Sequence, residues 1–236
     1  MNWLYLAIDI GCIIIPLLFS FYRKTYFFKE WKWFFPANFL VLIIFLIWDE
    51  FFTKIGVWGF NPKYISGIYL SHLPLEEVLF FICIPYACTF TYFCIKQFFS
   101  LEKYERFARI FFTILAIILF ILGVLNSGKY YTFFTFTFLS FCILLLIIFE
   151  KKKYLSYFFF TFLIILFPFF LSNGILTGSF IPEEVVWYNN QENLGIRMFT
   201  IPIEDTFYGM LLLLLNVSVY ENVKSFFIKK APPKQC

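Results

Sequence analysis

Seven long apolar runs dominate this chain and leave little choice of fold. Each is close to the roughly 20 residues that an α-helix needs to cross the hydrocarbon core of a bilayer. Of the 236 residues, 61% are apolar, against roughly 45–50% in a soluble domain. We therefore predict an all-α integral membrane protein with seven transmembrane helices and no separate soluble domain. The expected spans are roughly Trp3–Phe21, Phe34–Phe52, Pro74–Ile95, Ile110–Leu125, Tyr131–Phe149, Tyr154–Leu171 and Pro202–Tyr220.

Lysine and arginine residues are divided unevenly among the connections between these runs. Fifteen of the 19 follow the first, third, fifth and seventh runs. The other four, Lys54, Lys63, Lys129 and Arg197, lie in the alternate connections. Because cytoplasmic loops are enriched in positive residues, we predict a multi-pass protein of the cell membrane with its N-terminus outside and its C-terminus in the cytoplasm. An odd number of spans requires the same arrangement.

One phrase occurs twice, each time at the start of an apolar run. Gly67–Glu77 reads GIYLSHLPLEE and Gly195–Asp205 reads GIRMFTIPIED. The offset of 128 residues predicts a parallel internal repeat, with helices one to three matching five to seven and helix four as a linker. We expect the first repeat over residues 1–100, the linker helix within 101–128 and the second repeat over 129–236. Both phrases should then face each other on one side of the membrane.

The acids of this phrase are the main chemical signal in the sequence. Glu76, Glu77, Glu204 and Asp205 follow prolines that suit the first turn of a helix. Acids are also favoured at that position by capping and by the helix dipole alone. Two copies in the same register, each at the start of an apolar helix, favour a functional role over capping.

Paired carboxyl groups in an apolar pocket are suited to acid–base chemistry. Desolvation and like-charge repulsion disfavour the charged form of one group, which can then act as an acid while its neighbour accepts a proton later. Aromatic residues make up 25% of the chain, and their π-faces can stabilise a carbocation. The pattern favours a reaction on an apolar substrate that begins with protonation of an alkene.

Further polar residues are expected near the same end of the bundle. Asp9 lies inside the first run, and an acid within a membrane is a functional-site candidate by default; a hydrogen bond to a Ser or Asn of a neighbouring helix is the alternative. Asp49 and Glu50 end the second run on its outer side. Leaders rich in aromatic residues precede both acid motifs, one residue out of step, and the residues expected to contact a substrate there are Trp58, Asn61, Trp187 and Asn189.

Other reaction classes find no support in the sequence. It contains no GxGxxG, P-loop, HExxH or GxSxG motif. His72 is the only histidine, which excludes a multi-histidine metal site, and Pro202–Tyr220 contains no Lys for a retinal Schiff base. We therefore expect no cofactor, no metal and no nucleic-acid partner.

In Pro74–Glu77 and Pro202–Asp205, with their leaders and following helices, the chain resembles the membrane-embedded, flavin-free lycopene cyclase family. Some members of that family have two homologous subunits, and this chain is similar to the form in which the two halves are fused. The resemblance implies a lycopene β-cyclase, an isomerase (intramolecular lyase) of carotenoid biosynthesis that leads to β-carotene. In that reaction the terminal double bond of a ψ end is protonated, the next alkene attacks the cation, and loss of a proton fixes the double bond of the β-ionone ring.

Within this hypothesis Glu76 and Glu204 are the first choices for acid and base, with Glu77 and Asp205 as their partners. The second copy has Asp205 where the first has Glu77, which leaves open whether the copies play the same role. Lycopene and the lipid bilayer are the expected partners. Two alternatives stay open: a cyclase of another or longer carotenoid that makes ε or γ rings, and a non-catalytic membrane protein that binds a carotenoid or a partner subunit.

Overall fold

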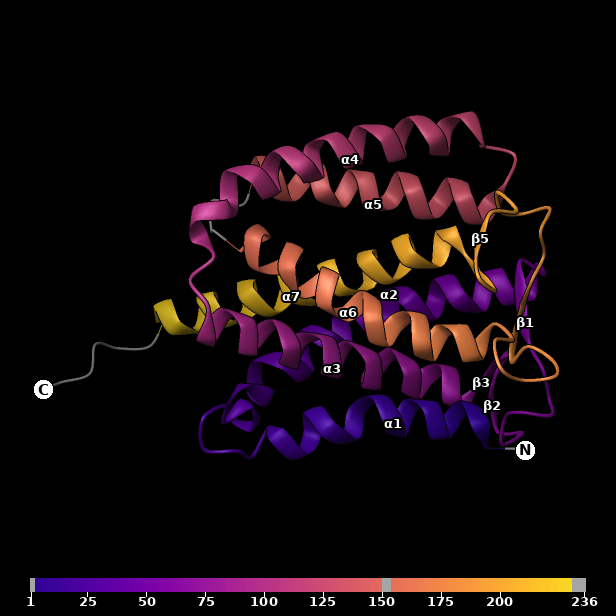
Figure 1. Cartoon of the computed structure of the whole chain (residues 1–236), viewed down its shortest axis with the longest axis horizontal. Coiled ribbons are helices and arrows are strands. Elements are labelled where there is room, and N and C mark those ends of the chain that lie inside the picture. Colours follow the sequence, from indigo (N-terminus) through magenta and orange to yellow (C-terminus); the bar gives the residue numbers. More distant parts are fainter. Residues whose placement is uncertain (1–2, 150–153, 231–236) are drawn as a thin grey trace, which may run out of the picture.

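The computed structural model describes residues 3–149 and 154–230, which form seven α-helices lying side by side (Figure 1). Six of them are long and apolar enough to cross a membrane, which confirms the prediction of an all-α membrane protein. The helices are α1 Leu4–Phe19, α2 Trp31–Lys54, α3 Leu75–Phe98, α4 Glu105–Leu125, α5 Tyr130–Phe149, α6 Leu155–Leu176 and α7 Ile203–Lys230, with short 3-10 helices at Phe27–Glu30 and Glu102–Tyr104.

Helix α1 is the one apolar helix that falls short of a typical span. Its 16 residues extend about 24 Å at 1.5 Å per residue, whereas the sequence predicted a longer helix over Trp3–Phe21. The chain turns directly after the helix, where the Ser20 hydroxyl donates to the carbonyl of Pro16 (2.7 Å) and lies 2.6 Å from the Tyr86 hydroxyl on α3. These contacts fix the end of α1 against its neighbour.

The first three and the last three helices interlock instead of forming two separate bundles. Helix α1 packs on α3, and α5 packs on α7. In addition, α2 packs on α7 and α6 packs on α3, so that each set of three covers a helix of the other. A buried amide pair marks the crossing of α2 and α7, where Asn38 Nδ2 donates to Asn216 Oδ1 (3.0 Å). Helix α4 packs on α5 at one edge of the bundle (Figure 1).

Six short strands lie in the connections at the end of the bundle where the chain begins (Figure 1). The sequence predicted none of them, because two or three residues are too few to show the alternation of a strand. They form three antiparallel pairs: β1 (Trp58–Phe60) with β4 (Val186–Tyr188), β2 (Tyr69–Leu70) with β3 (Leu73–Pro74), and β5 (Arg197–Met198) with β6 (Ile201–Pro202). The hairpins β2–β3 and β5–β6 lead directly into α3 and α7.

The two hairpins have the same backbone conformation at an offset of 128 residues. Leu75 N donates to Ile68 O (2.8 Å), and Ile203 N donates to Ile196 O (3.0 Å). At the tips, residues 71 and 199 have φ values of 57° and 58°, a left-handed conformation that is uncommon outside glycine. The duplicated phrase therefore folds twice into the same turn, and each turn sets the start of a helix.

The pair β1–β4 joins the two long connections, with Gly59 opposite Trp187 at its centre. A Cβ atom on Gly59 would lie 2.4 Å from the Trp187 ring, so only glycine fits beneath the indole. In the ladder Trp58 pairs with Tyr188 and Phe60 with Val186. Gly59 and Trp187 are 128 positions apart, the offset of the acid motifs, and at that offset Phe60 corresponds to Tyr188. The one-residue slip between the leaders in the sequence is absent from the ladder.

Connections at the opposite end of the bundle carry many of the basic residues. The α1–α2 and α3–α4 connections and the end of α7 lie there (Figure 1), where Lys224 pairs with Glu30 (2.6 Å) and Lys96 with Glu221. The run Lys151–Lys153 and Lys234 lie outside the described residues. The basic side of the bundle is thus the side away from the acid motifs, as the sequence predicted; which side faces the cytoplasm stays a prediction.

Candidate active site

Glu76 and Glu204 hold the loops that lead into the two hairpins. Ser66 N donates to Glu76 Oε1 (2.6 Å), and Leu194 N donates to Glu204 Oε1 (2.8 Å), again 128 residues apart. The Thr132 hydroxyl on α5 adds a second bond to Glu204 Oε1 (2.6 Å). Both carboxyl groups are buried, and neither lines the cavity described next.

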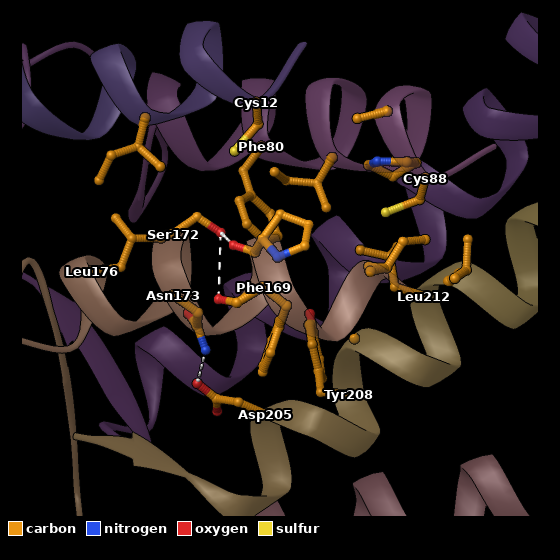
Figure 2. Close-up of a pocket in the computed structure, with 18 of the residues that line it drawn as sticks. Cys12, Phe80, Cys88, Phe169, Ser172, Asn173, Leu176, Asp205, Tyr208 and Leu212 are labelled. Carbon is orange, nitrogen blue, oxygen red and sulfur yellow. Dashed lines mark hydrogen bonds between the residues drawn. The ribbon is translucent and has the colours of Figure 1, made fainter. Parts of the chain in front are cut away.

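Glu77 and Asp205 face a common cavity of about 640 Å³ between α1, α3, α6 and α7. Figure 2 shows Asp205 with other residues that line this cavity. The end of the cavity that holds these two acids is its polar end. It lies beneath β1 and β4, where Trp58 and Tyr188 also line the cavity. From Glu77 the lining continues along α3 as far as Thr91, which is about 21 Å of helix. The volume lies in the usual range of small-molecule sites, and most of the lining is aliphatic or aromatic.

Three hydrogen-bond donors surround the carboxyl group of Asp205. The Tyr131 hydroxyl donates to Oδ1 (2.5 Å), while Asn173 Nδ2 (2.8 Å) and the Tyr188 hydroxyl (2.9 Å) donate to Oδ2. Figure 2 shows the amide of Asn173 on α6 reaching down to Asp205 on α7. Burial raises the pKa of Tyr188, which lies in a connection, well above its usual value, so its hydroxyl keeps its proton. Three donors stabilise the ionised form of a carboxyl group.

Glu77 has a poorer set of partners. Among the described residues its one hydrogen-bond donor is the Tyr5 hydroxyl, at 2.5 Å from Oε2. The other acids with which its carboxyl group interacts electrostatically are Asp9, Asp49 and Asp205. No ion pair of the described residues involves any of these four acids. A buried carboxyl group without a counter-ion is stable mainly as the neutral acid.

The secondary candidates from the sequence occupy three different environments. Asp49 lines the cavity and interacts with the Trp58 indole. Asp9 is fully buried behind the lining, and neither of its carboxyl oxygens has a hydrogen-bond partner in the described part of the chain, so the bond to Ser or Asn considered above is not present. Glu50 lies outside the cavity and accepts from the Ser71 hydroxyl (2.7 Å) at the tip of β2–β3.

Of the four leader residues expected to contact a substrate, the structure brings Trp58 to the cavity. Asn61 Nδ2 instead donates to Glu183 Oε2 (3.1 Å) in the opposite connection. Trp187 covers Gly59, and Asn189 Oδ1 accepts from Gln191 N within its own turn. These three residues hold the outer connections together without lining the cavity.

Sequence reasoning missed the neutral groups that hold the acids. Tyr5 and Tyr131 are each the second residue of their helix, α1 or α5, and bond to Glu77 and Asp205. They are 126 positions apart, so only a search that allowed a two-residue shift from the offset of the acid motifs could have found them. Asn173 and Tyr188 had no such signal, because Phe45 and Phe60 stand 128 positions before them. The described residues contain no group of three or more His, Cys, Asp or Glu that could bind a metal ion.

Comparison with known proteins gives one match. A family model described as "Lycopene cyclase" matches residues 2–95 and 128–223. Each matched segment contains one acid motif, one hairpin and most of the helix that follows, and the stretch between the segments contains α4. No curated protein and no solved structure matches the chain.

Proposed function

Because the chain belongs to the lycopene cyclase family, we propose that it is a lycopene β-cyclase, which isomerises the ψ ends of lycopene to β-ionone rings. The observation that carries this proposal is the convergence of Glu77 and Asp205 on one apolar cavity. A carotenoid end group is a hydrocarbon, and it needs an acid, a base and an apolar chamber. The cavity offers these three features at one end.

Glu77 is the proposed proton donor. Its burial and the lack of an ion-pair partner among the described residues favour its neutral form. Its proton passes to the terminal double bond of the ψ end, which leaves a tertiary cation on the adjacent carbon. The next trisubstituted alkene attacks that cation, closes the six-membered ring and moves the positive charge to a ring carbon.

Asp205 is the proposed carboxylate that balances this charge and removes the final proton. Its three donors favour the ionised form more than the single donor of Glu77 does. A proton leaves the ring carbon next to the cation, and its bonding electrons form the ring double bond. The net change in the protein is one proton moved from Glu77 to Asp205, and its return completes the cycle. No electron is transferred, so the reaction needs no redox cofactor.

Aromatic side chains at the polar end would stabilise the intermediate cation. Trp58 and Tyr208 both line the cavity beside the acids, and their rings are 6.1 Å apart between centroids. Electron-rich faces attract a cation within about 6 Å. In this proposal Glu76 and Glu204, the first choices of the sequence analysis, set the position of the reacting acids by holding the loops before α3 and α7.

The duplicated hairpins support a parallel internal repeat of α1–α3 and α5–α7 with α4 as linker, over residues 1–100, 101–128 and 129–236. We propose that the acid end of the bundle faces the outside and the basic end the cytoplasm. A reporter fused after residue 236 should then behave as cytoplasmic, and one inserted within residues 177–185 as external. Reversed signals would overturn this orientation.

Expression in cells that accumulate lycopene, followed by chromatography of the pigments, tests the activity. The expected product is a carotenoid with β-ionone rings. Products with ε or γ rings would keep the cyclase chemistry and correct the site of proton loss. If lycopene stays unchanged and co-purifies with the protein, the protein is a carotenoid-binding protein and not an enzyme.

A further inference from the structure

The cavity is closed at its two ends and open at its side. At the end beneath the connections, Tyr5, Trp58 and Val186 line it, and at most 8% of each residue is exposed. Toward the opposite end Cys88 and Leu212 are buried, and the lining on α3 ends at the half-buried Thr91. No lining residue at either end is exposed, so the exposed part of the lining lies at the side of the cavity.

The lining residues that are also exposed on the outer surface all come from two helices. They are Gly11 and Ile15 on α1 and Pro168 and Leu171 on α6. Ile15 and Leu171 are 62% and 55% exposed, although both also contact the cavity. Residues spaced by three or four share one face of a helix, so each pair forms one edge of the same opening. Figure 2 shows α1 and α6 on either side of this part of the cavity, with Cys12 and Ser172 facing each other.

We propose that this gap between α1 and α6 is a lateral opening through which a long apolar polyene enters from the bilayer, end group first. The proposal rests on the proposed function, because it assigns an entry path for the lycopene substrate. The side chains at the edges are apolar, and α6 is a candidate membrane span beside the apolar α1, so the occupant of the opening comes from lipid. On α6, Leu171 is two residues from Asn173, which bonds Asp205. An end group that enters here therefore reaches the acids directly.

Gly11 has a specific role in this opening. A Cβ atom added to it would meet no other atom within 4 Å, so the space beside it is free. Glycine is a poor helix former and is destabilising within a helix relative to alanine, and packing gives no reason for it here. A glycine at this position keeps the opening wide, and larger side chains should narrow it without a clash in the empty protein.

A graded series at Gly11 tests the opening. The variants Gly11→Val, Gly11→Leu and Gly11→Trp are reconstituted in lipid vesicles that contain lycopene, and the initial rate of conversion is measured. We expect the rate to fall with side-chain size, by about tenfold or more for tryptophan, because a bulky group in a confined passage is costly. Ile10→Trp is the matched control, since Ile10 is exposed on the same helix but does not line the cavity.

The second arm of the test widens the opening again by a compensating substitution. Shortening the neighbour with Ile15→Ala in the Gly11→Leu background should recover part of the lost rate, which a general folding defect would not do. Wild-type rates in all Gly11 variants, or equal losses in Ile10→Trp, would overturn the lateral opening while leaving the cyclase proposal intact. If the wild-type protein converts no lycopene, the proposed function fails. The opening is then tested by the amount of lycopene that the purified protein retains, and Gly11→Trp should lower that amount.

Discussion

The two acid sites have the same backbone but different side-chain partners. In the first half, Glu77 bonds to Tyr5, and Phe60 stacks on that tyrosine with ring centroids 6.5 Å apart. In the second half, Asp205 bonds to Tyr131, and Tyr188 stacks on Tyr131 at 5.8 Å and adds its own hydroxyl to the acid.

The difference teaches how one duplicated motif can supply both an acid and a base. Matching turns place the two carboxyl groups at the end of one cavity. In the proposed mechanism, the number of donors decides which of them holds a proton. A single hydroxyl group, present on Tyr188 and missing from Phe60, accounts for part of this difference. The predictions below test it from the largest expected effect to the smallest.

Removing the proposed donor should have the largest effect. Glu77→Gln keeps the shape of the side chain and its bond to Tyr5 but removes the titrating proton. Conversion of lycopene should fall by roughly 10²-fold or more at matched amounts of protein in the membrane. Wild-type activity in this variant would remove Glu77 from the chemistry, and Asp49 and Asp9 would be the next acids to replace.

Neutralising the proposed base should cost nearly as much. Asp205→Asn removes the negative charge and should lower conversion by roughly 10²-fold. Because the proposed base acts after ring closure, the pigments left in this variant should include products of misdirected proton loss, which chromatography would separate from β rings. If Asp205→Asn stays active while Glu77→Gln is inactive, one carboxyl group serves as both acid and base, and the division of roles is wrong.

The hydroxyl that distinguishes the two halves should have an intermediate effect. Tyr188→Phe removes one bond to a charged group, and such bonds contribute about 1.5–3 kcal/mol, so activity should fall by about tenfold or more. The converse change, Phe60→Tyr, is the control at the matching position and should change activity less. Equal effects from the two substitutions would contradict the view that the donors divide the roles.

Substitution of Glu76 or Glu204, the acids that hold the loops, should have the smallest effect on turnover. Glu76→Gln and Glu204→Gln keep an oxygen that accepts from Ser66 N and Leu194 N. The free energy of unfolding should fall by about 1 kcal/mol. Activity should stay within a few-fold of wild type at moderate temperature. A loss as large as that of Glu77→Gln, without loss of stability, would restore Glu76 and Glu204 as the reacting acids.

The sequence predicted the helices well because apolar runs are a strong signal of membrane spans. It also predicted that both acid motifs lie at one end of the bundle, since the repeat offset contains an even number of crossings. It could not rank the neighbouring acids. Glu76 and Glu77 differ by one step of about 100° around α3, and which of them faces the cavity depends on the packing of α1 and α6. That information is tertiary and leaves no trace in a short motif.

The connections were the least predictable part of the site. Tyr188 acts on Asp205 because β4 pairs with β1, and a ladder of three residues gives no periodic pattern. Asn173 lies in the last turns of an apolar helix beyond the predicted span Tyr154–Leu171, where a lone amide resembles many helix ends. Both residues could be recognised only after the fold had placed them beside an acid.

The crossed packing of α2 on α7 and of α6 on α3 has a genetic consequence. A chain divided in the turn between α4 and α5, around Ser127, would yield two fragments that each lack a covering helix and half of the cavity wall. Neither fragment could do part of the work alone, so a cell with such a split gene must keep its two products in balance. Until the two products assembled, each would be an unassembled subunit and a substrate for membrane proteases. Fusion of the halves removes that requirement for matched synthesis.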